Sequence, residues 1–214
     1  SGVPFVWATM HERMEAFLEG HVRAFEWFGG VVEKVVYDNL PTAVKKVLSG
    51  RQRELTERFV SLRAHYLFES IFCNPESPHE KGSVENLVGY VRRNALTPQP
   101  EVTSMDHLNE ILLSWCGKER EKRAEAWEAE RRELRALPAG IFHPCVSDVV
   151  RVSKLSLVTC HRNRYSVPNE LIGSTVRVDL YNDRVEIWRR ERLVAEHTRL
   201  LGRNNSSLKI EHYL

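Results

Sequence analysis

The first 40 residues of the chain combine two strand-like runs with one amphipathic segment. Residues 3–9 and 31–37 are rich in β-branched and aromatic side chains, which is typical of strands. Between residues 12 and 28, apolar side chains recur every three or four positions, as on one face of a helix, and Gly29-Gly30 then ends the pattern. A strand, a helix and a strand in this order predict a crossover unit with parallel pairing.

The alternation of strand and helix patterns continues up to residue 97. Residues 42–55 contain a Ser-Gly turn and predict a small hairpin, residues 54–66 predict a helix, and residues 66–73 predict a further strand. A loop rich in proline and polar residues follows at 74–82. We expect the next helix to begin near Ser83, because apolar residues then recur at helical spacing.

The pattern changes twice more along the chain. Two prolines between residues 97 and 104 predict a linker, and helices are predicted at 105–116 and 118–136. The second of these carries many charges of both signs, which is typical of a solvated helix face. After a break at 137–144, apolar and polar residues alternate within short runs, which is typical of strands. Residues 181–184 predict a tight hairpin. Several short strands in about 55 residues predict a small barrel.

These patterns predict an α/β fold class with four segments. We expect an α/β region at 1–97, a helical linker region at 98–144, a small β-barrel at 145–201 and a flexible, polar tail at 202–214.

The overall charge is nearly balanced, but its distribution is not. The 214 residues carry a net charge of +2, whereas residues 137–214 hold 12 basic and 8 acidic residues, a net charge of +4. This bias is a mild indication of a polyanionic partner. No apolar run is long enough for a membrane span, and no signal-peptide pattern opens the chain, so we expect no membrane partner.

The four cysteines are far apart and form no C-x-x-C pair. A zinc site built from Cys145, Cys160 and His161 is an alternative, but its spacing fits no usual zinc pattern. Reduced thiols in a cytosolic protein are the preferred interpretation.

Two acids at element ends are the candidates for chemistry. Asp38 follows the apolar run 31–37, where layered α/β sheets place their sites, but a turn cap with Asn39 and Pro41 is the preferred explanation of Asp38 taken alone. Glu85 is predicted near the start of a helix, where an acid also favours the helix dipole. Gly89, on the same helix face, indicates either close approach of a ligand or tight packing against the sheet. Taken singly, each acid is better explained by the structural alternative.

Taken together, the two acids suggest a divalent metal site. Carboxylate oxygens suit Mg²⁺, which substrate phosphates complete, and a pair of such ions assists phosphoryl transfer. That chemistry normally uses a third carboxylate, and residues 1–9 contain none.

Two blocks of the chain resemble the IstA-type transposases of bacterial insertion sequences. They are FEWFGGVVEKVVYDNLPTAV at 25–44 and CNPESPHEKGSVENLVGYVRRN at 73–94. These transposases belong to the DDE transposase and retroviral-integrase superfamily, so the resemblance implies that 1–97 is part of an RNase H-like integrase catalytic core. The stretch HRNRYSVPNELIGSTVRV at 161–178 is similar to the small barrel that follows this core in these and in Mu-like transposases.

The resemblance implies catalytic and metal-binding roles for Asp38 and Glu85. They take the places of the second and third acids of the DDE triad and hold two Mg²⁺ (or Mn²⁺) ions together with an upstream aspartate. That aspartate and the N-terminal DNA-binding region precede the segment that matches, so we expect this chain to be a fragment and inactive by itself. The intact enzyme would cleave DNA at transposon ends and transfer the strand into target DNA.

The resemblance also implies nucleic-acid contacts and partners. Near Glu85, the candidate phosphate contacts are Lys81, Arg92 and Arg93, which are otherwise ordinary surface charges. In the barrel, the candidates are Arg151, Lys154, Arg162 and Arg164. The implied partners are transposon-end and target DNA, further copies of the chain on DNA and an AAA+ ATPase helper, and the implied location is the bacterial cytoplasm at the nucleoid.

Two alternative functions remain open from the sequence. The first is a catalytically inert piece of a transposase that acts in DNA binding or assembly, since the charged helix and the barrel need no metal for that. The second is a nuclease of the same fold that hydrolyses DNA without joining it, which the barrel disfavours.

Overall fold

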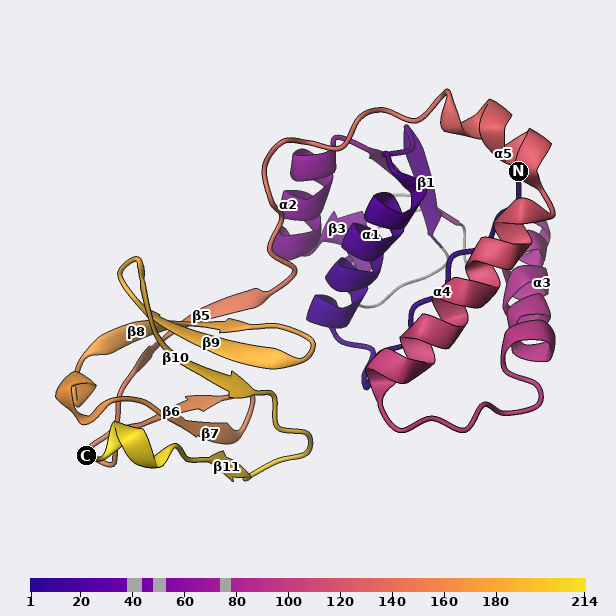
Figure 1. The fold of residues 1–214 in the computed structure, drawn as a ribbon. Helices are drawn as coiled ribbons and strands as arrows, with labels where there is room; N and C mark the ends of the chain where they lie inside the picture. The colour runs from indigo at the N-terminus through magenta and orange to yellow at the C-terminus, as the bar shows by residue number, and fades with distance from the viewer. Residues whose placement is uncertain (38–43, 48–52, 74–77) are drawn as a thin grey trace. The chain divides into compact units, whose positions relative to one another are not determined.

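The computed structural model describes residues 1–37, 44–47, 53–73 and 78–214 (Figure 1). Side chains are described for all of these except residues 44–47, 53–54 and 78–85. The chain divides into two compact units. The first unit holds residues 1–13 and 17–142, and the second unit holds residues 14–16 and 143–214.

From residue 12 to residue 142, the helices and strands follow in the order that the sequence predicts. They are α1 (Met14–Phe28), β1 (Lys34–Tyr37), β2 (Val44–Val47), β3 (Arg53–Leu55), α2 (Glu57–Tyr66), β4 (Glu69–Phe72), α3 (Pro78–Ala95), α4 (Met105–Glu121) and α5 (Ala124–Arg131). Helix α1 ends at Gly29, whose φ of 73° lies in the left-handed region that glycine adopts without strain. The predicted hairpin at 42–55 is confirmed by the antiparallel pairing of β2 with β3.

The predicted strand at residues 3–9 is wrong. No secondary structure forms there, and the backbone N–H of Ala8 instead donates to Oδ1 of Asn109 at 2.7 Å, while Nδ2 of Asn109 donates to the carbonyl of Ala8 at 3.1 Å. A side-chain amide thus replaces a neighbouring strand. The parallel pair is formed by β1 and β4, with Lys34 opposite Glu69 and Tyr37 opposite Phe72.

The first strand is also shorter than predicted. It begins at Lys34, whereas Val31 forms an isolated antiparallel bridge with Arg135. Two backbone hydrogen bonds make this bridge, at 2.9 and 3.0 Å. Aromatic side chains pack beside β1 and β4, and the ring centroids of Tyr37 and Phe72 lie 5.4 Å apart.

The helices after β4 differ from their predicted bounds. Helix α3 begins at Pro78, five residues before Ser83, and proline is well tolerated in the first turn of a helix. Helix α4 continues through Gly117 to Glu121, and α5 ends at Arg131.

The second unit consists of short strands, which agrees with the alternating pattern after residue 144. They are β5 (Val146–Arg151), β6 (Leu157–Cys160), β7 (Asn163–Ser166), β8 (Thr175–Leu180), β9 (Arg184–Arg189) and β10 (Arg192–Thr198). The predicted hairpin at 181–184 connects β8 and β9, which pair antiparallel. A short 3₁₀ helix, η1 (Asn169–Leu171), precedes β8.

The strands of the second unit do not close into the predicted barrel. Residues 143–214, all described, form one sheet in the order β10-β9-β8-β5 and another in the order β11-β7-β6, where β11 is Ser206–Ser207. The hairpin of β6 and β7 pairs with β11 and not with an edge of the larger sheet, so the two sheets stay separate. Both sheets contribute to one core, in which Val158, Tyr165 and Ile187 are almost fully buried.

Residues 202–214, expected to be a flexible tail, contain regular structure. Strand β11 pairs parallel with β7, and a 3₁₀ helix, η2 (Ile210–His212), follows. The hydroxyl of Ser166 lies 2.8 Å from Nδ1 of the buried His212 and accepts a hydrogen bond from the backbone N–H of Lys209 at 2.9 Å. These contacts fix the segment to the core.

Two further features bear on the environment of the protein. All four cysteines lie within the described residues, and each is buried and outside any disulfide. Among the described residues, no helix combines the length and apolar character needed to cross a bilayer.

Candidate functional site

The carboxyl ends of β1 and β4 lie together at one edge of the parallel pair. The backbone N–H of Cys73, just after β4, donates to the carbonyl of Tyr37 at 2.9 Å, so the pairing extends to the last residue of β1. Asp38 is the next residue in the chain. In sequence, Asp38 therefore directly follows the carboxyl end of a parallel strand, and parallel sheets place their sites at such ends. Asp38 itself lies outside the described residues, so its metal-binding role stays a prediction.

A buried pair of side chains holds the end of β1 against α1. Nε2 of His21 lies 2.8 Å from the hydroxyl of Tyr37, and Nδ1 of His21 lies 2.8 Å from the carbonyl of Phe17. A carbonyl only accepts, so Nδ1 carries the proton and Nε2 accepts from Tyr37. Burial lowers the pKa of His21, and the hydrogen bond to Phe17 opposes this. Burial also raises the pKa of Tyr37, so both groups stay neutral.

Glu85 and Lys81 lie on α3, and their side chains are not described. The predicted facing of Asp38 and Glu85 therefore stays a prediction. The bounds of the helix nevertheless change one alternative. Since α3 begins at Pro78, Glu85 is its eighth residue and lies beyond the first turn, where a helix dipole acts on a side chain. A dipole-stabilising role therefore does not explain this acid.

Among the described residues, the atoms nearest to Gly89 belong to Arg93 and not to the sheet. A Cβ atom at this glycine would lie 3.2 Å from a terminal nitrogen of Arg93, one turn further along α3. The glycine thus leaves room for the Arg93 guanidinium to lie across the helix. Arg92 and Arg93 are both exposed, and neither forms an ion pair with a described side chain.

A buried carboxylate joins α3 to α4. Glu119 on α4 is 1% exposed and accepts hydrogen bonds from three side chains: Tyr90 on α3 at 2.7 Å, Lys122 at 2.6 Å, and Arg123. Burial alone would raise the pKa of Glu119, but the hydrogen bonds from Lys122, Arg123 and Tyr90 outweigh it and lower the pKa to about 2. Glu119 is therefore ionised at neutral pH and fixes the half of α3 that follows Glu85.

No other metal site competes with the predicted one in the part of the chain that the structure describes. No group of three or more His, Cys, Asp or Glu side chains is placed to hold a metal ion there. The side chains of Asp38 and Glu85 lie outside that part of the chain, so this finding does not bear on them.

The four basic residues predicted for the second unit fall into two groups. Arg151 and Lys154 lie at the end of β5 and in the loop after it. Arg162 and Arg164 lie on the hairpin of β6 and β7, which is hydrogen-bonded to the loop 202–205. All four are exposed. The loop brings Arg203, a basic residue that the sequence analysis missed, next to this hairpin.

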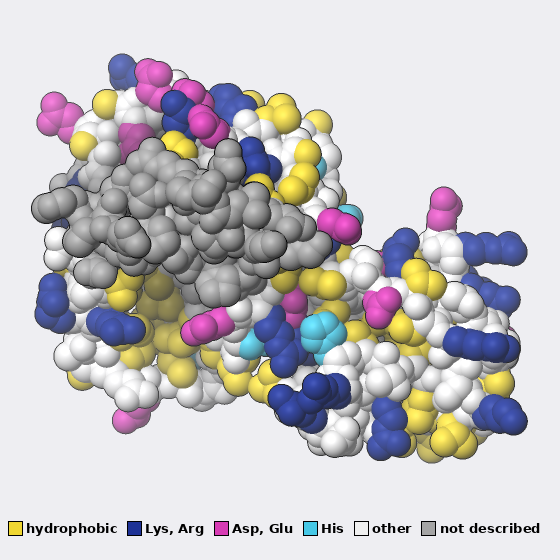
Figure 2. Space-filling model, turned by 180° about the vertical axis from the view of Figure 1, so that it is seen from behind, with side chains coloured by type: hydrophobic (Ala, Val, Ile, Leu, Met, Phe, Trp, Pro, Cys, Tyr) yellow, Lys and Arg dark blue, Asp and Glu magenta, His cyan; other side chains and the backbone are white. Residues whose placement is uncertain are grey.

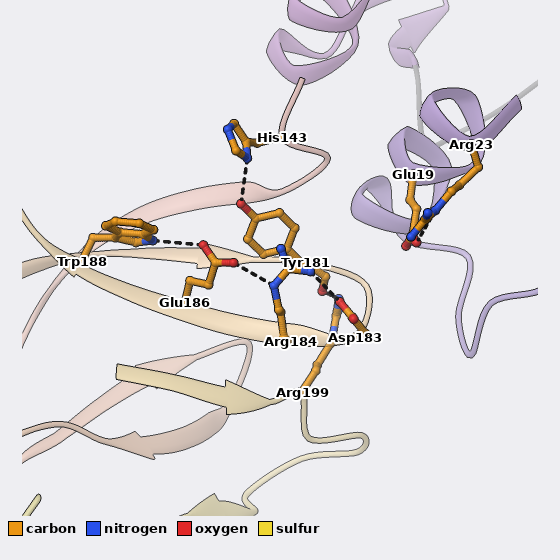
Figure 3. A network of polar contacts seen from close by, with 9 residues as sticks. All are labelled: Glu19, Arg23, His143, Tyr181, Asp183, Arg184, Glu186, Trp188 and Arg199. Atoms are coloured by element: carbon orange, nitrogen blue, oxygen red, sulfur yellow. Dashed lines mark hydrogen bonds and ion pairs between the residues drawn. The ribbon is translucent and has the colours of Figure 1, made fainter. Parts of the chain in front are cut away.

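Three other arginines of the second unit have partners (Figure 3). Arg184 pairs with Glu186 at 2.7 Å and with Asp183 at 3.2 Å, and Glu186 also accepts from Nε1 of Trp188 at 3.2 Å. Arg199 donates to the carbonyl of Tyr181. Arg177, which Figure 3 does not draw, donates to both carboxylate oxygens of Asp179 at 3.0 and 3.1 Å. These contacts stabilise the outer face of the larger sheet and balance part of its charge.

A second group of basic residues was also missed. Arg189, Arg190 and Arg192 surround the connection between β9 and β10, and all are exposed. The signal was present in the sequence as the run Arg-Arg-Glu-Arg at 189–192, between two alternating segments.

Comparison with known proteins extends these observations. The domain family described as "Mu transposase, C-terminal domain" matches residues 137–209. A transposase from Aminobacter aminovorans is 36% identical over 208 residues, which cover 92% of this chain and 41% of that protein. The transposase for insertion sequences IS1326/IS1353 from Pseudomonas aeruginosa is 33% identical over 221 residues, covering 97% of this chain and 43% of that protein.

This chain is a homologue of insertion-sequence transposases. The transposase for insertion sequence element IS21 from Pseudomonas aeruginosa is 32% identical over 202 residues, covering 90% of this chain and 52% of that protein. The chain thus spans about two fifths to one half of the length of these transposases. The similarity to these transposases extends over both units, and the match to the Mu domain family lies almost entirely in the second.

Proposed function

We propose that this chain acts in a DDE-type transposase that cleaves DNA at transposon ends and joins the ends to target DNA. The observation that supports this most is homology to transposases over 90% or more of the chain. The parallel pair of β1 and β4 adds support, since Asp38 directly follows its carboxyl edge.

The donor groups that we assign to the metal fit Mg²⁺ or Mn²⁺. Asp38 and Glu85 offer hard carboxylate oxygens, and Glu85 lies beyond the first turn of α3, in which a helix-dipole role would place it. When bound, two such ions would supply Lewis-acid stabilisation of charge on the phosphoryl oxygens. The chain's own part is to hold Asp38 at the end of a sheet strand and Glu85 on a helix that Glu119 fixes to α4.

Basic side chains would bind the phosphates of the DNA backbone and so position the DNA. We assign Lys81, Arg92 and Arg93 to phosphates near the reacting strand, since they lie on the same helix as Glu85. Arg151, Lys154, Arg162 and Arg164 are assigned to DNA outside the reacting strand. We further propose that the protein works as a homo-oligomer on DNA with an AAA+ ATPase helper, in the cytoplasm at the nucleoid.

Substitution of the two acids tests the catalytic assignment. The protein is expressed from its complete reading frame and assayed for joining of transposon-end DNA to a target plasmid in Mg²⁺. Asp38→Asn and Glu85→Gln each remove one metal-binding charge at nearly constant volume, so we expect joined products to fall by at least about 100-fold, as for other essential electrostatic groups.

Matched controls separate catalysis from a general loss of charge. Asp148→Asn and Glu196→Gln make the same chemical changes at exposed positions of the second unit and should retain joining. Joining at the parental rate by both Asp38→Asn and Glu85→Gln contradicts the proposal.

A second candidate function is DNA binding or assembly without catalysis. The net charge of +4 in residues 137–214 favours it, because binding through phosphates needs no metal. A complete protein that binds transposon-end DNA but joins none of it, with parental Asp38 and Glu85 in place, supports this second function.

A further inference from the structure

One end of the four-stranded sheet in the second unit is strongly basic. In the order β10-β9-β8-β5, neighbouring strands are antiparallel, so β10 and β8 begin where β9 and β5 end. Arg192 opens β10, Arg189 closes β9, and Arg151 closes β5 opposite Thr175. Residues from three strands thus lie at the same end of the sheet. Figure 2 shows several Lys and Arg side chains gathered at one side of the second unit.

The basic charges at this end are largely uncompensated. Arg189, Arg190, Arg192 and Lys154 form no ion pair with any described side chain. Arg151 donates through Nε to the carbonyl of Gly173 at 3.1 Å, a contact that orients its guanidinium without neutralising it. Arg189, Arg190 and Arg192 line a groove together with two acids, Glu170 and Glu191, so one positive charge is in excess there. Arg151 and Lys154, at the end of β5 and in the loop after it, bring the excess to three.

The shape of this end suits an extended polyanion. An open groove of about 570 Å³ runs between η1 and the β9–β10 connection. Arg189, Arg190 and Arg192 line one side of it, and Leu171 and Val194 lie among the other lining residues. Several exposed guanidinium groups along a groove, with no single deep pocket, match a phosphodiester backbone better than a small anion.

The backbone at Arg190 gives an independent indication. Arg190 has a φ of 53°, in the left-handed region, at the first position of a two-residue hairpin connection. Glycine or asparagine usually occupies such a position, because a larger side chain is strained there. Glycine at this position would form the same hairpin without strain. The presence of a strained arginine therefore indicates that its side chain has a function.

From these observations we propose that Arg189, Arg190 and Arg192, together with Arg151 and Lys154, form a binding surface for the DNA backbone. This surface is named the basic sheet end below. The inference rests on the proposed function for the identity of the polyanion. It adds to that function a surface whose main residues lie on a hairpin that the sequence analysis did not assign. Contacts there are to phosphates, so they hold DNA of any sequence.

Binding of a labelled duplex tests the basic sheet end without any catalytic readout. The 214-residue chain is titrated onto a fluorescent 30-base-pair duplex of arbitrary sequence, in EDTA, at salt concentrations from about 50 to 200 mM. The triple variant Arg189→Gln/Arg190→Gly/Arg192→Gln should weaken binding at least about tenfold. It should also make the negative slope of log K against log salt less steep, by about 2 to 3.

Two further variants separate this surface from net charge and from folding. Lys118→Gln/Arg131→Gln/Arg132→Gln removes three exposed charges from α4 and the end of α5 in the first unit, and should leave the slope almost unchanged. Arg190→Lys keeps the charge and should bind nearly as the parent does, whereas Arg190→Gly should lower the slope by about 1 while the melting temperature does not fall.

Three results would overturn the inference. They are parental binding by the first triple variant, equal weakening by both triple variants, and no binding of the duplex by the parental chain. Parental binding by the first triple variant is also the result expected if an acidic protein, and not DNA, occupies the groove. The proposed catalytic function fails by a different result, since it requires loss of joining in Asp38→Asn and Glu85→Gln and makes no demand on binding in EDTA.

Discussion

Arg190 combines a strained backbone conformation with a proposed contact to DNA. A non-glycine residue in the left-handed region is destabilised by about 1–2 kcal/mol relative to the right-handed one. The connection between β9 and β10 nevertheless has arginine at this position, with a φ of 53°. Its neighbours Arg189 and Arg192 face each other across the hairpin in ordinary strand conformation. The strain therefore belongs to this residue and not to the hairpin as a whole.

Replacing Arg190 by glycine should not destabilise the protein. Glycine relieves the left-handed strain but adds conformational entropy to the unfolded chain, so we expect a gain of about 0–1 kcal/mol in the free energy of unfolding. Urea denaturation at neutral pH measures it. Arg189→Gly is the matched control at the last residue of β9, and it should lose up to about 0.5–1 kcal/mol, because glycine loses more conformational freedom on folding and Arg189 has no left-handed strain to relieve. A larger loss for Arg190→Gly than for the control contradicts this account.

Asn109 shows where the sequence could not predict the partner of a residue. The β-branched and aromatic side chains of residues 3–9 predict a strand. Their partner is a side-chain amide 101 positions away from Ala8, and no local pattern encodes such a contact. The strand pattern was therefore misleading about the pairing of this segment.

At the scale of elements, α3 changes the interpretation of Glu85. A start near Ser83 would make Glu85 a first-turn acid, whereas the observed start at Pro78 places it beyond the first turn. The proline-rich sequence favoured a loop at 74–82, yet proline in the first turn of a helix leaves no lost hydrogen bond. The sequence thus predicted the helix and its apolar stripe, but not the start that decides between two roles for the acid.

The junction of α3 and α4 should depend on the charge of Glu119. Glu119→Gln removes charge-assisted hydrogen bonds from Tyr90, Lys122 and Arg123, so we expect a loss of about 1–3 kcal/mol in the free energy of unfolding at pH 7. Urea denaturation measures it. Glu121→Gln, an exposed neighbour on the same helix, should change stability by less than about 0.5 kcal/mol.

The pH dependence of this effect follows from the direction of the pKa shift. The folded pKa of Glu119 is about 2, below the ordinary value of 4.5, so the unfolded chain takes up the proton first as the pH falls. The stabilisation is therefore complete above about pH 4.5 and is lost towards pH 2. The difference between the parent and Glu119→Gln should shrink from pH 7 to pH 3, and a constant difference would show that the charge is not the cause.

At the scale of the whole molecule, the strands could be predicted from the sequence, whereas the pairing of strand edges that are distant in sequence could not. Alternation along residues 145–198 predicted short strands there, as expected where alternate residues are buried, for example in β8 and β10. Closure into a barrel was not predictable in the same way, because it depends on which edges meet, and β7 meets β11. The basic sheet end was missed for the same reason, since strands distant in sequence assemble it.

Binding and catalysis should be separable between the two units. Asp38 and Glu85 belong to the first unit, and the basic sheet end belongs to the second. We expect Asp38→Asn to bind the 30-base-pair duplex in EDTA at least as tightly as the parent, because it removes a negative charge and no phosphate contact. Fluorescence anisotropy measures this. A loss of affinity as large as that of the arginine triple variant would show that one surface serves both roles.

The burial of all four cysteines has a practical consequence. Buried thiols are poorly accessible to alkylating dyes, and burial raises the pKa of Cys160 to about 11, which further suppresses its thiolate. A cysteine introduced at the exposed Glu191, on the β9–β10 connection, would therefore be the preferred labelling position in a chain with all its native cysteines. A fluorophore attached there would report the arrival of DNA at that hairpin in real time.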